Sequence, residues 1–445
     1  MGMKRKIYDA LLEWKDHNWS QSLLLKGSRQ VGKTYIVKKF GKEEFHNLLY
    51  INFEDQQDMK KIFDQIPNPD EAVKTLQAYG LSKNIFSIEG KDTLIFMDEI
   101  QLCKRAYSLL KPLTETGRFR IVSSGSLLGI ALCGDFLDPG PSVHHLEMMP
   151  MDFEEFLWAV HGPEIGPMLE TVRSECKRGN LINEALHSTL NRDLRDYIIV
   201  GGMPRAVIEF VQNKDLGKVF LKQAEIVSLY RSDIQRYQTT QDAKMKTLKC
   251  FESIPNQFSK ENHRFVYSAV EPQKSARDYE NSIDWLEKTG NARMCYHVDH
   301  FRGSLIDGKG KLFKLYLNDI GLLVCMLGKE YVFKIQNNEL GLFKGAIYEQ
   351  LLAQMLQSKN IPLYYARIGE YEIDFLVESE GGIIPVECKS GGSTKSKSLQ
   401  NYVKTFTPHK AFKISSNNVN ISDGIIKAIP HYAFALLGFE DMVRL

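Results

Sequence analysis

The sequence has no long apolar run, although it has 445 residues. Its longest apolar stretches, such as residues 432–439, are too short to cross a bilayer. Residues 1–6 are basic, and the segment after them is amphipathic, with Ile7, Leu11 and Trp14, and does not resemble the apolar core of a signal peptide. We therefore expect a cytoplasmic protein without membrane contact.

Paired cysteines and an excess of charge are also missing. The seven cysteines are scattered and form no CxxC pair, which argues against a disulfide framework or a zinc site and fits reduced thiols. Lys and Arg total 57 against 55 Asp and Glu, a net charge of +2. With this balance the whole chain has no field that would draw it to nucleic acid, so any such contact must come from a local patch.

The composition that is present is that of a globular protein, with 43% hydrophobic and 25% charged residues. At roughly 150 residues per domain, the length suggests about three domains. Short apolar segments at 22–25, 48–53, 93–97 and 119–123 alternate with helix-like segments. This alternation predicts an α/β fold with a parallel sheet.

A phosphate-binding motif follows the first of these strands and opens a helix. The motif GxxxxGK[ST] is matched by Gly27, Ser28, Arg29, Gln30, Val31, Gly32, Lys33 and Thr34. Its glycines let backbone N–H groups turn toward phosphate oxygens, and the helix N-terminus adds partial positive charge. We expect Lys33 to reach the β- and γ-phosphates of ATP and Thr34 to ligate Mg²⁺.

Two consecutive carboxylates, Asp98 and Glu99, end the apolar strand at 93–97. Acids at the end of a buried strand are costly without a cation partner. We expect Asp98 to hold Mg²⁺ through water and Glu99 to orient and deprotonate the attacking water. At the end of the next strand, a hydroxyl could sense the γ-phosphate. Ser124 is the first choice and Ser126 the second, although serines that merely end a strand are an equal alternative.

The rest of the chain changes character twice. Residues 152–237 look helical, and residues 250–325 run helix, strand, glycine-containing loop, strand, an order that suits a winged helix-turn-helix. Its helix at 276–289 carries four acids, so packing against protein is as plausible as DNA binding; the expected wing contains Lys309, Lys311 and Lys314. After about residue 335 a new α/β unit follows, with a helix at 345–356 and strands at 363–366, 372–378 and 382–389.

This last unit carries acids and a lysine in a pattern that suits metal-dependent phosphodiester hydrolysis. Glu387 and Lys389 are two apart and share a strand face, and Asp374 can join them from the neighbouring hairpin strand. The arrangement resembles the PD-(D/E)xK nuclease fold, and Glu349 stands where that family's first helix usually supplies another acid. The alternative is a set of solvated strand residues, and the lysines at 389, 395, 397, 404, 410 and 413 could either track phosphates or form a solvated face.

A series of motifs resembles the prokaryotic AAA+-related ATPases of the archaeal-ATPase type. These motifs are RKIY (5–8), GSRQVGKT (27–34), MDEIQ (97–101), SSGSLLG (123–129), PMDFEEF (150–156) and GGMP (201–204). YRSDI (230–234), FKLYLNDIGLL (313–323) and ECKSG (387–391) match the branch with a C-terminal domain of unknown function.

The resemblance implies an AAA+-like core at 1–158, a helical lid at 159–240, a winged-helix-like domain at 241–330 and a nuclease-like domain at 331–445. It places the GGMP segment in the lid near the nucleotide. Related ATPases often form rings, so a homo-oligomer is possible. Arg118, Arg120, Arg205 and Arg231 are candidates for an arginine finger, and none stands out.

Two functional hypotheses follow. In the first, a Mg²⁺-dependent ATPase is coupled to a nuclease-like domain that acts on or binds DNA. In the second, the chain is a nucleotide-switched regulatory or binding module whose nuclease-like domain is catalytically silent.

Overall fold

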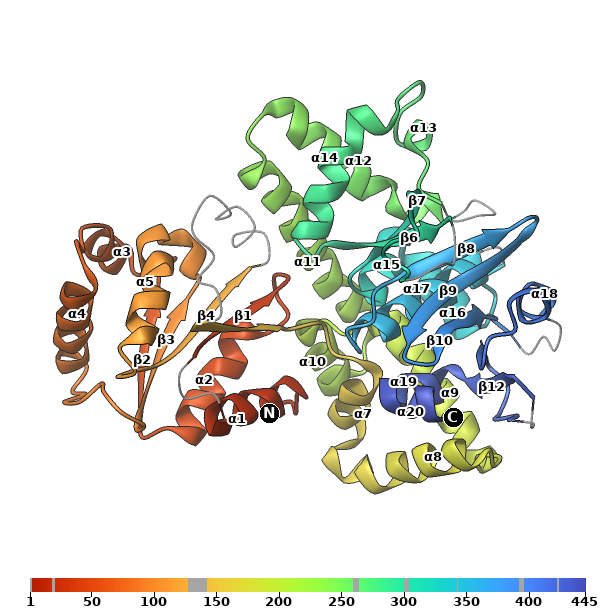
Figure 1. Ribbon diagram of the computed structural model, residues 1–445, viewed down its shortest axis with the longest axis horizontal. Helices are drawn as coiled ribbons and strands as arrows, with labels where there is room; N and C mark the ends of the chain where they lie inside the picture. Colours follow the sequence, from red (N-terminus) through yellow and green to blue (C-terminus); the bar gives the residue numbers. More distant parts are fainter. Residues whose placement is uncertain are drawn as a thin grey trace. The chain divides into compact units, whose positions relative to one another are not determined.

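The computed structural model describes residues 2–17, 21–126, 142–258, 264–299, 304–341, 343–391, 396–421 and 424–445. Its contacts divide the chain into two compact units (Figure 1). The N-terminal unit comprises residues 4–149 and 288–290, and the C-terminal unit comprises residues 1–3, 150–287 and 291–445.

The described strands of the N-terminal unit form one parallel sheet in the order β2-β3-β4-β1-β5, which confirms the predicted α/β core with a parallel sheet. They are β1 (Ser22–Gly27), β2 (Asn47–Asn52), β3 (Thr93–Asp98), β4 (Arg120–Ser126) and β5 (Val143–Glu147). Strand β4 lies between β1 and β3, with Ser124 opposite Leu25 and Ser123 opposite Met97. The carboxyl ends of β1, β3 and β4 therefore meet at one edge of the sheet.

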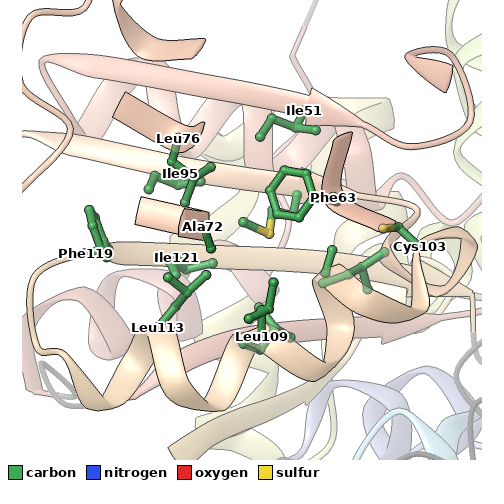
Figure 2. Close-up of a cluster of buried hydrophobic side chains, with 14 of the residues drawn as sticks. Ile51, Phe63, Ala72, Leu76, Ile95, Cys103, Leu109, Leu113, Phe119 and Ile121 are labelled. Carbon is green, nitrogen blue, oxygen red and sulfur yellow. The ribbon is translucent and has the colours of Figure 1, made fainter. Parts of the chain in front are cut away.

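An apolar cluster on this sheet holds the strands in place (Figure 2). Neighbouring residues Ile95 of β3 and Ile121 of β4 are fully or almost fully buried there, together with Leu109 and Leu113 of a covering helix. The helices of the unit are α1 (Ile7–His17), α2 (Lys33–Glu44), α3 (Gln57–Asp64), α4 (Pro69–Ser82), the 3₁₀ turn η1 (Ile100–Leu102) and α5 (Lys104–Glu115). Strands β3 and β4 are buried along their whole length. Only β3 reads as a nearly continuous apolar run in the sequence, because β4 is apolar at Ile121 and Val122 and then continues with Ser and Gly.

The described strands of the C-terminal unit form a mixed sheet in the order β12-β11-β10-β9-β8-β6-β7. They are β6 (Ala292–Val298), β7 (Lys309–Leu317), β8 (Tyr364–Ile368), β9 (Tyr371–Ser379), β10 (Gly382–Cys388), β11 (Ala411–Ser415) and β12 (Ile426–Pro430). The sequence predicts that β6 and β7 belong to a separate winged-helix domain. In the structure β6 also pairs with β8, so both strands extend the C-terminal sheet.

The described helices of the C-terminal unit are α7 (Phe153–His161), η3 (Pro163–Ile165), α8 (Gly166–Arg178), α9 (Glu184–Val200), α10 (Pro204–Asn213), α11 (Leu216–Tyr237), α12 (Gln241–Gln257), α13 (Tyr267–Val270), α14 (Ala276–Lys288), α15 (Ile320–Leu327), α16 (Lys329–Gln336), α17 (Phe343–Gln357), α18 (Lys397–Phe406), α19 (His431–Leu436) and α20 (Phe439–Arg444). Helices from the two ends of this sequence contact one another, as α7 and α19 do.

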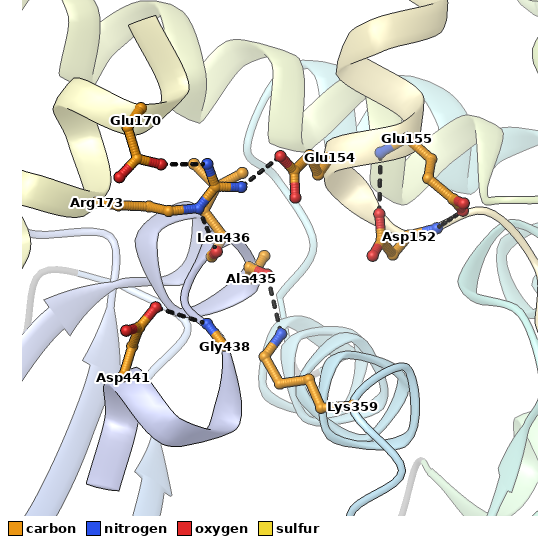
Figure 3. A network of polar contacts seen from close by, with 10 residues as sticks. All are labelled: Asp152, Glu154, Glu155, Glu170, Arg173, Lys359, Ala435, Leu436, Gly438 and Asp441. Atoms are coloured by element: carbon orange, nitrogen blue, oxygen red, sulfur yellow. Dashed lines mark hydrogen bonds and ion pairs between the residues drawn. The ribbon is translucent and has the colours of Figure 1, made fainter. Parts of the chain in front are cut away.

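One arginine joins these distant parts of the sequence. Arg173 of α8 pairs with Glu154 of α7 and Glu170, and donates to the Leu436 carbonyl at 2.9 Å (Figure 3). Residues expected in a separate lid thus contact the end of the chain within one compact unit. The four-part division at residues 158, 240 and 330 stays a prediction.

Three of the family-like motifs meet at a buried polar node. The Gly202 N–H donates to Asp319 Oδ2 at 2.6 Å, and the Gly202 carbonyl accepts from the Met151 N–H at 2.7 Å. A Cβ atom on Gly202 would lie 2.0 Å from the Met151 carbonyl oxygen, so this close approach requires glycine. The contacts of the GGMP segment described here are therefore structural, and its expected place near the nucleotide stays a prediction.

Within the described residues, no helix is both long and apolar enough to cross a membrane. The cysteines that the structure describes are all free thiols, and Cys133 lies outside those residues.

Candidate nucleotide site and C-terminal acidic cluster

The loop between β1 and α2 has the backbone that its glycines predict. Gly32 has φ of 100° and Gln30 has φ of 67°, both in the left-handed region. Gly27 packs so closely against the backbone after β5 that a Cβ atom would lie 2.4 Å from the Met148 carbonyl oxygen. The loop thus turns sharply between the last residue of β1 and the first residue of α2.

Lys33 places its ammonium group inside this loop. Its Nζ donates to the carbonyls of Gly27 at 2.9 Å and Ser28 at 3.0 Å, and the residue is only 7% exposed. Burial lowers the pKa of Lys33 to about 8, although Glu99 and Asp98 act in the opposite direction. A cation that has lost most of its hydration gains from an anionic ligand, so the loop suits a phosphate chain.

Asp98 connects three elements of the site. Its Oδ2 accepts hydrogen bonds from the Thr34 hydroxyl at 2.8 Å and from the Tyr50 hydroxyl at 3.1 Å. Its Oδ1 accepts a hydrogen bond from the Ser124 hydroxyl. The structure therefore brings together the predicted residues Thr34, Asp98 and Ser124 from α2, β3 and β4.

Tyr50 was not predicted from the sequence. It lies on β2, next to β3 in the sheet, and the Asn52 side chain donates to its hydroxyl at 2.9 Å. A tyrosine in an apolar strand gives no sequence signal of its own, because it is common in buried strands. The register of β2 on β3, with Asn52 opposite Asp98, is what brings it to the carboxylate.

Glu99 follows β3 in a conformation that few non-glycine residues adopt. Its φ is 52°, and its carboxylate accepts from the Gln101 side chain at 2.5 Å. Burial raises its pKa above the usual range for glutamate. Such backbone strain and a raised pKa are both typical of a catalytic base, so the position suits the predicted role.

The other residues predicted at this site lie in the loop or at the end of β4. Ser126 is buried at the end of β4, Ser28 and Val31 are buried in the loop, and Arg29 is partly buried beside them. The SSGSLLG motif continues past Ser126 into residues that lie outside the described part of the chain.

The four arginine-finger candidates all have partners within their own unit. Arg118 pairs with Glu89, Arg205 pairs with Glu225 at 3.3 Å, and Arg231 pairs with Glu252 at 2.5 Å. Arg120 is 2% exposed and lies over the Trp14 ring, 5.7 Å from its centroid. These contacts do not single out any one of them as a finger.

In the C-terminal unit, the predicted residue Asp374 lies within β9, beside Glu387 and Lys389 at the end of β10. Asp374 Oδ2 accepts from the Cys388 N–H at 2.7 Å, and Glu387 pairs with Lys389 at 2.5 Å. Glu387 also accepts from the Leu399 N–H in the first turn of α18 at 2.9 Å. Burial, and then the charge of Glu349, raise the pKa of Asp374 to about 7.

The cluster also contains a buried lysine, Lys314, that was predicted to lie elsewhere. Lys314 was expected on an exposed wing, but it is fully buried on β7 and pairs with Glu349 and Glu372, each at 2.7 Å. Tyr316, two residues along the same strand face, donates to Glu349 at 2.5 Å. Burial alone would lower the pKa of Lys314, but the charges of Glu349 and Glu372 outweigh it and raise that pKa.

Glu349 is therefore satisfied by a lysine and a tyrosine of its own unit. In the described ranges, no group of three or more His, Cys, Asp or Glu residues is arranged to hold a metal ion. The signal for this buried lysine in the sequence was the pair Lys314 and Tyr316 in FKLYL, two residues apart on one strand face. A lysine on a strand face that is otherwise apolar needs an acidic partner.

The predicted lysine track is also partly internal. Lys410 is 7% exposed and donates to the carbonyls of Met442, at 3.3 Å, and Val443. Lys413 is equally buried, and Lys395 lies outside the described residues. Lys410 and Lys413 thus belong to neither a solvated face nor an open phosphate track.

Three models of known protein families match successive parts of the chain. A family model described as an AAA domain matches residues 20–157, and two models of domains of unknown function, DUF8612 and DUF4143, match residues 191–331 and 343–434. Residues 20–157 are thus similar to an AAA domain. A search of curated proteins found no match.

Solved structures show weaker likenesses. A Walker-type ATPase of Pyrococcus abyssi is 12% identical with a TM-score of 0.45, covering 73% of this chain and 96% of that one. The ORC1 protein of Aeropyrum pernix, solved in complex with DNA, is 12% identical with a TM-score of 0.29, covering 75% and 95%. At these TM-scores the likenesses support no conclusion about function.

Proposed function

We propose that this chain hydrolyses ATP at its N-terminal unit. The observation that carries the proposal is the joining of Thr34, Asp98 and Ser124 at one sheet edge, beside a buried lysine in a phosphate-binding loop. Nucleotide binding alone would require only the loop and Lys33. The strained, half-buried Glu99 next to Asp98 supports hydrolysis as well, because a positioned carboxylate can deprotonate water.

The chain's residues divide the work as follows. Lys33 and the loop N–H groups hold the β- and γ-phosphates, and Glu99 orients a water molecule in line with the γ-phosphorus and takes its proton as the bond to the leaving oxygen breaks. The Thr34 hydroxyl and the Asp98 carboxylate, 2.8 Å apart, offer the oxygen donors that Mg²⁺ prefers. When bound there, Mg²⁺ would neutralise charge on the phosphates.

Two variants test the ATPase proposal. ATP turnover is measured on wild type, Lys33→Ala and Lys42→Ala, an exposed lysine on the same helix. We expect Lys33→Ala to lose turnover by at least about 100-fold and Lys42→Ala to keep it. Unchanged turnover in Lys33→Ala would refute the proposal.

For the C-terminal unit we propose a nucleotide-switched binding or regulatory role in which the nuclease-like acids are silent. The supporting observation is the pairing of Lys314 with Glu349 and Glu372, which satisfies two acids of the cluster by an internal ammonium group. The competing proposal, cleavage of DNA, is favoured by the gathering of Asp374, Glu387 and Lys389 in the predicted pattern.

One pair of measurements decides between these roles. DNA cleavage with Mg²⁺ or Mn²⁺ is measured on single- and double-stranded substrates, with Asp374→Ala as the control. Cleavage that is lost in Asp374→Ala would establish the nuclease role. Absence of cleavage, with ATP turnover that duplex DNA does not change, would favour the switch and direct the search to a protein partner. Turnover stimulated by DNA and abolished by Glu99→Gln would join both units in one DNA-dependent machine.

A further inference from the structure

A cavity of about 690 Å³ lies in the C-terminal unit, and none of its lining residues is among those assigned above to ATP. It is lined by side chains of α18, β11 and β12, by the segment at 417–421, and by Gly179 and Leu181 after α8. This volume falls within the range of roughly 300–1,000 Å³ that small-molecule sites occupy. Lys413 and Ser415, two residues apart, present one face of β11 to it.

A buried hydroxyl in this cavity lacks the partner that such a group needs. Ser396 is 3% exposed, and among the described residues its Oγ has no hydrogen-bond partner. It is the N-cap residue of α18, yet its side chain does not cap the helix. Because a buried polar atom without a partner is costly, the Ser396 hydroxyl would gain from a hydrogen bond to a group bound in the cavity.

The lining of the cavity also carries positive charge. Lys413 is 7% exposed, and the ten-residue helix α18 begins beside it with the partial positive charge of its N-terminus. Glu387 neighbours Lys413 across the sheet, pairs with Lys389 and accepts from the Leu399 N–H in the first turn of α18. Burial lowers the pKa of Lys413, as expected for an ammonium group that has lost hydration.

Part of the lining is apolar. Leu181 is 71% exposed although it borders the cavity, and Ile421 and Ile426 lie on the same lining. The backbone next to Leu181 is fixed, because the Asn418 side chain accepts from the Ile182 N–H at 3.0 Å and donates to the Ile182 carbonyl at 2.7 Å. A leucine held at the rim in this way can cover the apolar part of a ligand.

We propose that this cavity binds a small organic oxyanion, a phosphate or carboxylate carried on an apolar or aromatic body. The anionic group lies against Ser396, Lys413 and the N-terminus of α18, and the body lies against Leu181 and Ile426. The site does not depend on the ATPase proposal, because all of its residues belong to the C-terminal unit.

The test uses the full chain with saturating Mg-ADP, so that the phosphate-binding loop is occupied. Phenyl phosphate and benzoate are titrated separately by ligand-observed NMR, with inorganic phosphate as a third probe. We expect saturable binding of at least one aromatic probe, and which of the two binds more tightly identifies the anionic group. Lys413→Met should weaken binding at least about tenfold. Lys404→Met, an exposed lysine on α18, should leave it unchanged.

A second variant keeps the test decisive if Lys413→Met fails to fold. Leu181→Asp changes an exposed side chain, so it should fold, and it should abolish binding of both aromatic probes by placing a like charge at the rim. Absence of saturable binding by either aromatic probe, equal binding in Lys404→Met and Lys413→Met, or unchanged binding in Leu181→Asp would each overturn the proposal.

Discussion

Thr34 donates its side-chain hydroxyl to Asp98 at 2.8 Å, across 64 positions of sequence. The bond joins the first turn of α2 to the end of β3, and these two elements carry the two halves of the phosphate site. Ser124 reaches the other oxygen of the same carboxylate from β4, the strand between β1 and β3. The Asp98 carboxylate thus contacts both α2 and β4. Substitutions of the residues around it therefore test the proposed mechanism.

Replacing Glu99 by glutamine should separate binding from hydrolysis. The change keeps the size of the side chain and removes the base, so we expect ATP turnover to fall by about 100-fold or more while nucleotide affinity stays within about threefold. Turnover and the dissociation constant of a fluorescent nucleotide are both measured. Glu115→Gln, which alters an exposed glutamate on α5, serves as the control. Comparable turnover in Glu99→Gln and wild type would remove Glu99 from the mechanism.

The two adjacent serines of β4 form a matched pair for testing the proposed sensor. The Ser124 hydroxyl donates to Asp98, whereas the Ser123 hydroxyl donates to the Leu23 carbonyl at 3.2 Å. We expect Ser124→Ala to lower turnover by about tenfold or more and to cost at least as much unfolding free energy as Ser123→Ala, because its hydroxyl bonds a carboxylate. Ser123→Ala should cost about 1 kcal/mol of unfolding free energy and leave turnover nearly intact. The reverse pattern would show that Ser124 merely ends a strand.

The phosphate site was largely predictable from sequence because its signals are local. Eight consecutive residues specify the loop, and Asp98 and Glu99 end an apolar run. A parallel sheet then brings the strand ends together whatever the details of the packing. Tyr50 escaped prediction because its role depends on the register of β2 beside β3, a long-range property.

The C-terminal unit was less predictable for the same reason. The helix, strand, loop, strand order around β6 and β7 fits a winged helix locally, and nothing within those residues reveals that β6 pairs with β8 about 70 residues later. Lys314 looked like one of several wing lysines, although Lys311 is exposed and Lys314 is fully buried. Burial of a lysine becomes visible only when Glu349 and Glu372 are placed beside it.

The Lys314 pairing predicts a large effect on stability. Lys314→Met leaves Glu349 and Glu372 without their shared cation, and we expect a loss of about 3–5 kcal/mol in the free energy of unfolding, measured with urea. Lys311→Met on the same strand should change it by less than about 0.5 kcal/mol. Adding Glu349→Gln to Lys314→Met should recover part of the loss. A loss below about 1 kcal/mol in Lys314→Met would mean that the pairing is not formed.

Asp319 gives a pH-dependent prediction at the buried node that joins three motifs. Burial raises its pKa from 3.8 to about 6, although the N–H groups of Gly202 and Leu322 act in the opposite direction. Between pH 4 and 6 the folded chain therefore binds more protons at this group than the unfolded chain. Its contribution to stability is complete below pH 4 and is lost as the pH rises through 6, a change of roughly 3 kcal/mol.

Asp319→Asn removes this titration. The variant will be less stable overall, because one of the two carboxylate oxygens becomes an NH₂ group facing backbone donors. The decisive quantity is therefore the difference in unfolding free energy between wild type and variant, measured with urea at pH values from 4 to 7. We expect this difference to shrink as the pH rises, because only the wild type loses the contribution. A difference that stays constant across this range would show that Asp319 keeps an ordinary pKa despite its burial.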